Sequence, residues 1–330
     1  MAHALEQDLN HVLTRTGDLW EALRDQNIFI TGGTGFVGAW LVQSLVWANE
    51  RLGLNARATL LTRNPDRFRS KAPEAANHPS VQFLRGGITS FEFPERDFAF
   101  VIHAATGNFP EVEGTRRVLE FARTHGTRRF LFTSSGAVYG KQPADLTHIP
   151  EDYPGVEPYS PYGHAKRISE WLCLTHARQY EFAAAIARLF AFAGPYLPLD
   201  LNFAIGNFVA DVLAGRPVRI AGNGTPYRSY LYAADLAIWL WTILIKGEST
   251  RPYNVGSGDA ITIAQLAQAV VENTVPATRI EIACKAAPGV PAARYVPSVD
   301  RAGRELGLYP IIPLEEAIRR MYAWNRTVKS

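Results

Sequence analysis

The chain has 330 residues, 47% hydrophobic and 20% charged, a composition that excludes a fibrous, disulfide-stapled or wholly disordered protein. Its 34 basic and 31 acidic residues leave a net charge of +3, too small and too dispersed to favour nucleic-acid binding. Two cysteines, Cys173 and Cys284, and eight scattered histidines offer no ligand spacing for a metal and fit a reducing, cytoplasmic compartment.

The first 26 residues are predicted to form a helical extension. Apolar residues recur there at helical spacing, at Leu5, Leu9, Val12 and Leu13. Asp18 and Glu21 resemble a capping box that opens a second short helix. The segment has no apolar run typical of a secretory signal, and the longest apolar stretch, Leu236–Ile245, is about half of what a membrane helix needs. We therefore expect no membrane attachment.

From Asn27 onward, short apolar runs alternate with amphipathic stretches. Strands are predicted at Asn27–Thr31, Ala58–Thr62, Val81–Leu84, Ala99–His103, Phe130–Ser134 and Ala183–Leu189. The stretches between them predict helices, among them Ala39–Asn49, Gly114–His125 and Tyr162–Tyr180. Apolar strands joined by helices indicate a parallel sheet that is covered on both faces. Residues 27–190 are thus predicted to form a doubly wound α/β domain.

Residues 191–330 are predicted to form a smaller, less regular α/β region. After Gly194 the sequence loosens into loops rich in glycine and proline, with one strand at Tyr253–Val255 and helices at Thr262–Asn273 and Leu314–Trp324. Residues 229–257, approximately, are expected to pack back on the first domain, so the two regions are partly interleaved.

A glycine-rich loop, Thr31–Gly38, joins the first strand to its helix. Glycines at this point let the backbone approach a pyrophosphate, and the helix N-terminus supplies amide donors. The spacing is G-x-x-G-x-x-G, which matches the common dinucleotide fingerprint only in part. The other interpretation is a turn that merely allows tight strand–helix packing. Its position favours a dinucleotide site of the Rossmann type.

The residue type that follows the second strand bears on the choice of cofactor. An acid that binds the ribose 2′-hydroxyl of NAD is expected near Thr62 and is absent. Arg63 stands there instead, and its guanidinium suits a 2′-phosphate. NADP is therefore favoured over NAD, although an arginine at a strand end can also be a solvated surface charge.

Tyr162 and Lys166 are four residues apart in a predicted helix, which places phenol and ammonium on the same helix face. The ordinary pKa of tyrosine is about 10, so a tyrosine acts as a base near neutrality only beside a cation that stabilises its phenolate. Ser134 and Ser135 end a strand, at the edge where α/β sheets bind ligands. The alternative is a partly buried tyrosine beside a solvated lysine.

Four segments together resemble the extended short-chain dehydrogenase/reductase family, the NAD-dependent epimerase/dehydratase group. They are Thr31–Gly38, His103–Ala105, Ser134–Gly140 and Tyr162–Lys166, in this order. The resemblance implies that Tyr162 is the acid/base, that Lys166 binds the nicotinamide ribose and that Ser135 orients the substrate. With Arg63 included, the expected cofactor site comprises Gly32, Gly35, Phe36, Val37, Gly38, Arg63, Ile88, Ala104, Ala105, Tyr162, Lys166 and Phe190.

The second region resembles the part of this family that binds nucleotide sugars. Gly222–Asp235 is similar to a stretch typical of those members, and Arg228 and Arg294 match arginines that hold the diphosphate. Arginine is suited to this task because its forked donors bind phosphate oxygens bidentately. The resemblance implies a nucleotide-diphosphate sugar as substrate, bound by Ser135, Arg228 and Arg294, and a homodimeric enzyme.

The chain departs from the family pattern at several positions. Gly87 replaces an acid near the adenine, Glu111 and Ala191 each replace an asparagine, and the connection at 106–113 is shorter than usual. That short connection either opens the substrate pocket to water or reflects a segment lost from this chain. Gly136 and Ala137 stand where 4,6-dehydratases of the family carry an Asp–Glu pair, which argues against that reaction.

Two functions remain open on the sequence. The first is a nucleotide-sugar 4-epimerase or 4-keto-sugar reductase that uses NADP or NAD. A preference for NADP would favour the reductase, since an epimerase keeps its cofactor bound and cycling. The second is a dinucleotide-binding protein of the same fold without turnover, which Glu111, Gly87 and the short connection suggest and the presence of Ser135, Tyr162 and Lys166 opposes.

Overall fold

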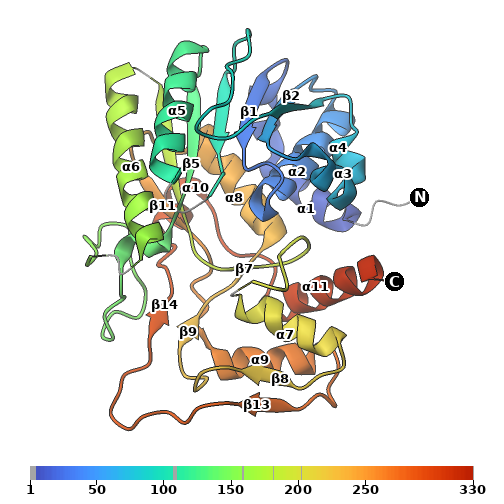
Figure 1. The fold of residues 1–330 in the computed structure, drawn as a ribbon, viewed down its shortest axis with the longest axis vertical. Coiled ribbons are helices and arrows are strands. Elements are labelled where there is room, and N and C mark those ends of the chain that lie inside the picture. The colour runs from blue at the N-terminus through green and yellow to red at the C-terminus, as the bar shows by residue number, and fades with distance from the viewer. Residues whose placement is uncertain (1–4, 107–109, 158–159, 181, 202, 330) are drawn as a thin grey trace. The chain divides into compact units, whose positions relative to one another are not determined.

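The chain forms two compact units that alternate along the sequence (Figure 1). The computed structural model describes residues 5–106, 110–157, 160–180, 182–201 and 203–329. The first unit comprises Met1–Gly140, Val156–Leu189 and Ala237–Tyr253, and the second comprises Lys141–Gly155, Phe190–Leu236 and Asn254–Ser330. The domain boundaries proposed from the sequence stay predictions. They are 1–26, 27–190 and 191–330, with residues 229–257 expected to pack on the first α/β domain.

A seven-stranded sheet organises the first unit. Its strand order is β11-β6-β5-β4-β1-β2-β3. Neighbouring strands from β6 to β3 pair in parallel. The strands are β1 (Asn27–Thr31), β2 (Arg57–Thr62), β3 (Val81–Arg85), β4 (Phe100–His103), β5 (Arg129–Ser135), β6 (Ala183–Leu189) and β11 (Pro252–Val255). All seven predicted strands are present, and the predicted doubly wound parallel sheet is confirmed.

Helices cover both faces of this sheet. Phe29 of β1 packs into an aromatic cluster with Phe121 of α5 (Pro110–Thr124) and with residues of α6 (Pro161–Tyr180). Ile28 and Ile30, which point to the opposite face, are also fully buried. Trp241 of α8 (Ala233–Lys246) donates to Ser44 of α2 (Phe36–Leu52), so these two helices lie together. The α5–α6 pair stands apart from α2 in Figure 1.

The N-terminal extension is helical, but the predicted capping box is wrong. Helix α1 (Glu6–Thr16) is followed by a 3₁₀ helix, Gly17–Leu23, whose N-cap Thr16 makes no side-chain capping bond. Instead the Thr16 hydroxyl donates to the Val12 carbonyl and accepts from Trp20. Glu21 pairs with Arg24. The buried Trp20 ring thus decides this local geometry.

The second unit contains more helix than the sequence pattern predicts. Its helices are α7 (Ala204–Leu213), α9 (Ile263–Glu272), α10 (Asp300–Leu306) and α11 (Leu314–Lys329). Helix α8, which spans the boundary between the units, was also not predicted. Nearly all its side chains are buried, so its sequence lacks the polar stripe that reveals an amphipathic helix.

Three small sheets complete the second unit. They pair β7 (Phe192–Ala193) with β10 (Leu231–Tyr232), β8 (Val218–Ile220) with β13 (Ile280–Ile282), and β9 (Tyr227–Arg228) with β12 (Ile261–Thr262) and β14 (Arg294–Tyr295).

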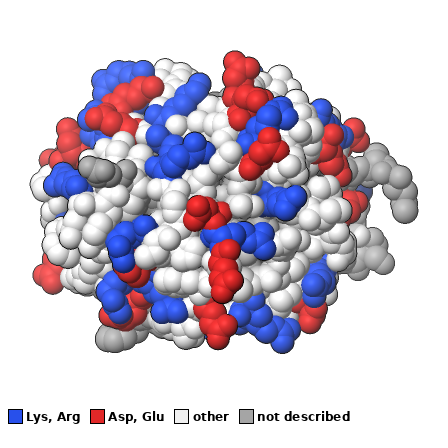
Figure 2. Space-filling view, turned by 90° about the horizontal axis from the view of Figure 1, so that it is seen from above, with Lys and Arg blue, Asp and Glu red and all other residues white. Residues whose placement is uncertain are grey.

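Among the described residues, no helix is long and apolar enough to cross a membrane. Basic and acidic side chains are intermixed on the face seen in Figure 2. The short helices α3 (Pro65–Lys71) and α4 (Pro73–Ala76) belong to the first unit.

Candidate active site

Most of the predicted site residues follow the carboxyl ends of the parallel strands. The glycine loop follows β1, Arg63 follows β2, Ile88 comes after β3, Ala104 and Ala105 follow β4, Ser135 ends β5, and Phe190 follows β6. In a parallel sheet these ends share one edge. The chain reverses its direction of winding between β1 and β4, and such a switch point is where doubly wound sheets bind ligands.

The glycine loop is shaped for close backbone approach. Gly32 has φ +69°, and a Cβ there would lie 2.4 Å from the Ala104 carbonyl carbon. A Cβ on Gly38 would lie 2.3 Å from the Gly32 carbonyl oxygen. Gly35 is the N-cap of α2 and has no side chain that could cap the helix. The first-turn amides of α2 therefore point out of the helix N-terminus without a side-chain acceptor from the N-cap. Glycine at 32 and 38 is therefore required by packing within the protein, and the uncapped first turn of α2 is the feature that suits a dinucleotide pyrophosphate.

A basic group also contacts the glycine loop. The Lys71 ammonium, at the end of α3, donates to the carbonyls of Thr34 at 3.4 Å and Gly35 at 3.2 Å. Burial, assisted by the charge of Arg67, lowers the pKa of Lys71 to about 8. Arg63 is exposed at the end of β2. Sequence reasoning missed Lys71, because nothing in the spacing brings α3 back to the loop.

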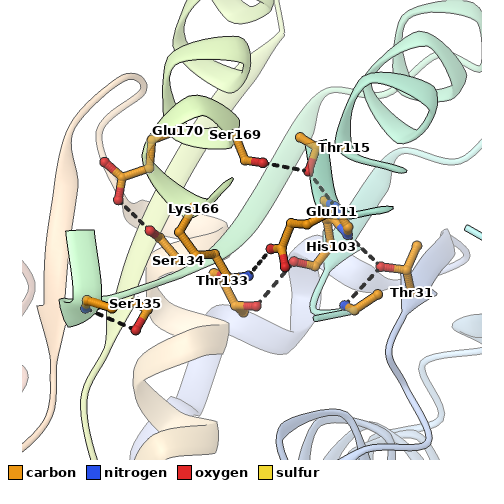
Figure 3. A network of polar contacts seen from close by, with 12 residues as sticks. Thr31, His103, Glu111, Thr115, Thr133, Ser134, Ser135, Lys166, Ser169 and Glu170 are labelled. Atoms are coloured by element: carbon orange, nitrogen blue, oxygen red, sulfur yellow. Dashed lines mark hydrogen bonds and ion pairs between the residues drawn. The ribbon is translucent and has the colours of Figure 1, made fainter. Parts of the chain in front are cut away.

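A buried chain of hydrogen bonds joins β1 to β4, α5 and α6. His103 bonds Thr31 at 2.7 Å through Nδ1 and Thr115 at 3.0 Å through Nε2, and Thr115 donates to Ser169. Thr31 also accepts the Ala105 amide. Burial, and then the charge of Lys166, lower the pKa of His103 to about 3, so its ring is neutral. These hydrogen bonds hold the loop after β4 against Thr31, where the glycine loop begins (Figure 3).

Ser134 and Ser135 have different surroundings although they are adjacent. The Ser135 hydroxyl accepts the Ala137 amide at 3.1 Å, where the 3₁₀ helix Gly136–Tyr139 begins. The Ser134 hydroxyl donates to Glu170, which receives two further hydrogen bonds from Arg188. Ser134 is therefore held in a structural network, whereas the assignment of Ser135 to the substrate stays a prediction.

The predicted pair Tyr162 and Lys166 lies on the first turns of α6. The Lys166 ammonium is 5.7 Å from the centre of the Tyr162 ring and donates to the Thr133 carbonyl at 2.8 Å. It also forms an ion pair with Glu111 of α5, and both side chains are 1% exposed. Figure 3 shows Glu111 and Lys166 turned toward each other beneath α5 and α6. Tyr162 is half-buried.

The two predicted substrate arginines occupy one small sheet of the second unit but not one face of it. Arg294 pairs in register with Tyr227, and Tyr295 pairs with Arg228. The Arg294 guanidinium accordingly lies 4.1 Å from the Tyr227 ring centre, whereas that of Arg228 lies 5.8 Å from the Tyr295 ring centre. Paired residues share a face and sequence neighbours oppose each other. The two guanidinium groups are therefore separated by the sheet.

Phe190, which the resemblance assigns to the cofactor site, belongs to the second unit. Its ring contacts the Tyr295 ring at 4.7 Å, on the face that carries Arg228. The short connection at 106–113 includes residues 107–109, which lie outside the described part of the chain. Sequence reasoning missed the roles of Glu111, Glu170 and Arg188. The sequence feature that could have revealed them is a charged residue at a helix or strand position whose neighbours indicate burial, because buried charges are usually paired.

Comparison with known proteins agrees with the predicted family and fold. The sequence pattern of the NAD dependent epimerase/dehydratase family matches residues 28–256. UDP-glucuronic acid decarboxylase 6 of Arabidopsis thaliana is 30% identical over 315 residues, covering 90% of this chain and 88% of the plant protein.

Solved structures of similar fold include two epimerases. UDP-glucose 4-epimerase of Thermotoga maritima, with UDP-glucose, has a TM-score of 0.76 and 22% identity, covering 92% of this chain and 100% of that one. UDP-glucuronic acid 4-epimerase of Bacillus cereus, in complex with a UDP-sugar analogue and NAD, has a TM-score of 0.77 and 21% identity, covering 92% and 99%. The family pattern spans more than half of the chain, and the chain is an enzyme of the NAD dependent epimerase/dehydratase family.

Proposed function

We propose that this enzyme uses NAD(P) to oxidise or reduce a carbinol or keto carbon of a nucleotide-diphosphate sugar, as a 4-epimerase or a 4-keto-sugar reductase. One observation carries the proposal. Ser135 and the Tyr162–Lys166 pair belong to the same unit as the glycine loop and come from the carboxyl end of β5 and the start of α6. Relatives whose names include UDP-glucuronic acid decarboxylase and UDP-glucose 4-epimerase support a sugar nucleotide as substrate.

Each of the three side chains has a task in this chemistry. The nicotinamide, when bound, accepts or donates the hydride. Tyr162 takes the proton from the sugar hydroxyl during oxidation and returns it during reduction. Ser135 already accepts the Ala137 amide, which leaves its own proton to donate to the same substrate oxygen. Lys166, at 5.7 Å from the Tyr162 ring, stabilises the phenolate that this proton transfer requires.

A second outcome deserves testing because several relatives are UDP-glucuronic acid decarboxylases. Oxidation of a uronic acid at C4 produces a β-keto acid, which loses CO₂ readily, so the same side chains suffice for a decarboxylase. The test is incubation with UDP-, dTDP-, CDP- and GDP-linked sugars, uronic acids and 4-keto-sugars, with NAD(H) or NADP(H), followed by mass spectrometry and NMR. Unchanged mass with an inverted configuration in the NMR spectrum indicates epimerisation, two added hydrogens indicate reduction, and loss of CO₂ indicates decarboxylation. If the protein converts none of these compounds, the alternative function, a dinucleotide-binding protein without turnover, is favoured.

Cofactor choice is predicted to depend on Arg63. The unmodified enzyme should bind NADP more tightly than NAD, and Arg63→Ala should weaken NADP about tenfold to a hundredfold, as for the loss of a hydrogen bond to a charged group. NAD binding should not change, because NAD lacks the 2′-phosphate. Fluorescence or calorimetric titration measures both constants. Arg69→Ala on α3 is the matched control, because Arg69 is exposed and pairs with Asp66. Preference for NAD, unaltered by Arg63→Ala, would contradict the assignment.

The substrate arginines are predicted to contribute unequally. Arg228 shares a face of its small sheet with Tyr295 and with Phe190, the residue that the resemblance assigns to the cofactor site, so we assign the diphosphate to Arg228. Arg228→Ala should raise KM for the nucleotide sugar about tenfold or more with kcat little changed, because a charge-assisted hydrogen bond is lost. Arg294→Ala is the matched control and should leave KM within about twofold. Equal effects would mean that both arginines hold the diphosphate, and a larger effect for Arg294 would reverse the assignment.

A further inference from the structure

Lys166 has a buried counter-ion, Glu111, at a position where the resemblance to the family implies a neutral asparagine. Glu111 lies on the first turn of α5, and its carboxylate pairs with the Lys166 ammonium while both side chains are 1% exposed. Among the described residues, the ammonium also contacts the Thr133 carbonyl and lies 4.8 Å and 5.7 Å from the ring centres of Phe132 and Tyr162. Glu111 is therefore the anion that compensates this cation.

The other titratable groups around this pair do not provide that compensation. His103 of β4 is neutral and bonded to Thr31 and Thr115. Glu170, one turn after Lys166, accepts hydrogen bonds from the Ser134 hydroxyl and from two nitrogens of Arg188. Arg188 also donates to the Tyr139 hydroxyl. Burial raises the pKa of the Cys173 thiol well above its usual value, so this group is uncharged. Within the described residues, the net charge beside Tyr162 is thus set by Glu111 and Lys166.

We propose that Glu111 is a positioning residue that keeps Lys166 beside Tyr162 and offsets its charge, so that the site retains the oxidised, positively charged nicotinamide while Lys166 still faces the Tyr162 ring. The inference rests on the proposed function, because the resemblance implies that Lys166 binds the nicotinamide ribose. A buried ammonium without a partner is unfavourable and repels a second cation nearby. With Glu111 present, its carboxylate offsets the repulsion between the Lys166 ammonium and the oxidised ring.

The proposal predicts a charge-dependent preference between the two redox forms of the cofactor. The oxidised ring carries a positive charge and the reduced ring carries none, so only binding of the oxidised form responds to an uncompensated ammonium. Glu111→Gln removes the compensating carboxylate and leaves the Lys166 ammonium without it. The variant should therefore bind oxidised cofactor about tenfold more weakly, relative to reduced cofactor, than the unmodified enzyme does at the same pH.

The experiment is titration of the full chain with NADP⁺ and NADPH, and with NAD⁺ and NADH, at one pH. Glu113→Gln is the matched control, since Glu113 lies on the same turn of α5, is exposed and pairs with Arg116. Glu111→Asp keeps the charge and should keep the affinity ratio of the unmodified enzyme. The double variant Glu111→Gln/Lys166→Met removes both charges, should fold even if Glu111→Gln fails to fold, and should also keep that ratio.

The outcomes separate this inference from the proposed function. Equal weakening of both redox forms in Glu111→Gln would show a merely structural role for Glu111 and overturn the inference alone. If Glu111→Gln does not fold, Glu111→Asp and the double variant decide, because a ratio that differs from that of the unmodified enzyme in either of them overturns the inference. Absence of dinucleotide binding in the unmodified enzyme would overturn the proposed function and this inference together.

Discussion

Replacement of Tyr162 by phenylalanine is expected to lower kcat by a factor of about 10²–10⁴, the usual contribution of a general acid/base. The phenol hydroxyl is the group that exchanges a proton with the sugar oxygen, and phenylalanine keeps the ring while it removes that proton. The contact between the ring and the Lys166 ammonium, at 5.7 Å, should survive. Steady-state kinetics with the sugar identified by mass spectrometry measures kcat, and titration should show nearly unchanged affinity for the cofactor.

Tyr180→Phe is the matched control for this prediction. Tyr180 ends the same helix, α6, and is 39% exposed, so its hydroxyl is remote from the predicted chemistry in sequence and in environment. Its kcat should match that of the unmodified enzyme. Turnover by Tyr162→Phe at the parent rate would remove Tyr162 from the mechanism and, with it, the assignment of Ser135 and Lys166 as its partners.

Replacement of Arg188 by methionine is expected to lower the free energy of unfolding by about 3–5 kcal/mol, the cost of breaking a buried ion pair from one side. Arg188 is 14% exposed and binds both oxygens of Glu170, at 2.9 Å and 2.7 Å, and the Tyr139 hydroxyl at 2.8 Å. Although burial opposes its charge, the bonds to Glu170 raise the pKa of Arg188 above its usual value. Methionine would leave the Glu170 carboxylate buried without its cation. Urea denaturation followed by circular dichroism measures the loss.

Two further variants distinguish an ion pair from simple packing. Arg188→Met/Glu170→Gln removes both charges and should recover much of the lost stability, because no uncompensated carboxylate remains. Arg116→Ala, which breaks the exposed pair with Glu113, should cost less than about 1 kcal/mol. If the double variant is as unstable as Arg188→Met, the loss arises from packing of the Arg188 stem and the electrostatic account fails.

Much of the fold follows from local patterns. The strands at Asn27–Thr31 and Ala183–Leu189 have the predicted bounds, because a buried parallel strand is apolar along its whole length and is bounded by turn residues. Helix α8 escaped prediction for the related reason that a helix buried on all sides shows no periodicity. The predicted capping box at Asp18 failed because Trp20 anchors to Thr16 instead.

The sequence by itself determined the parallel sheet, the position of the glycine loop and the spacing of Tyr162 and Lys166, because each follows from a pattern of residue types along the chain. Only the tertiary structure decided that Glu111 is the counter-ion of Lys166 and that Arg188 pairs with Glu170. These charges are separated in the chain and meet where α6 packs against α5 and against β6. The tertiary structure also decided that Arg228 and Arg294 lie on opposite faces of one small sheet, because strand register fixes which side chains share a face and no motif records that register.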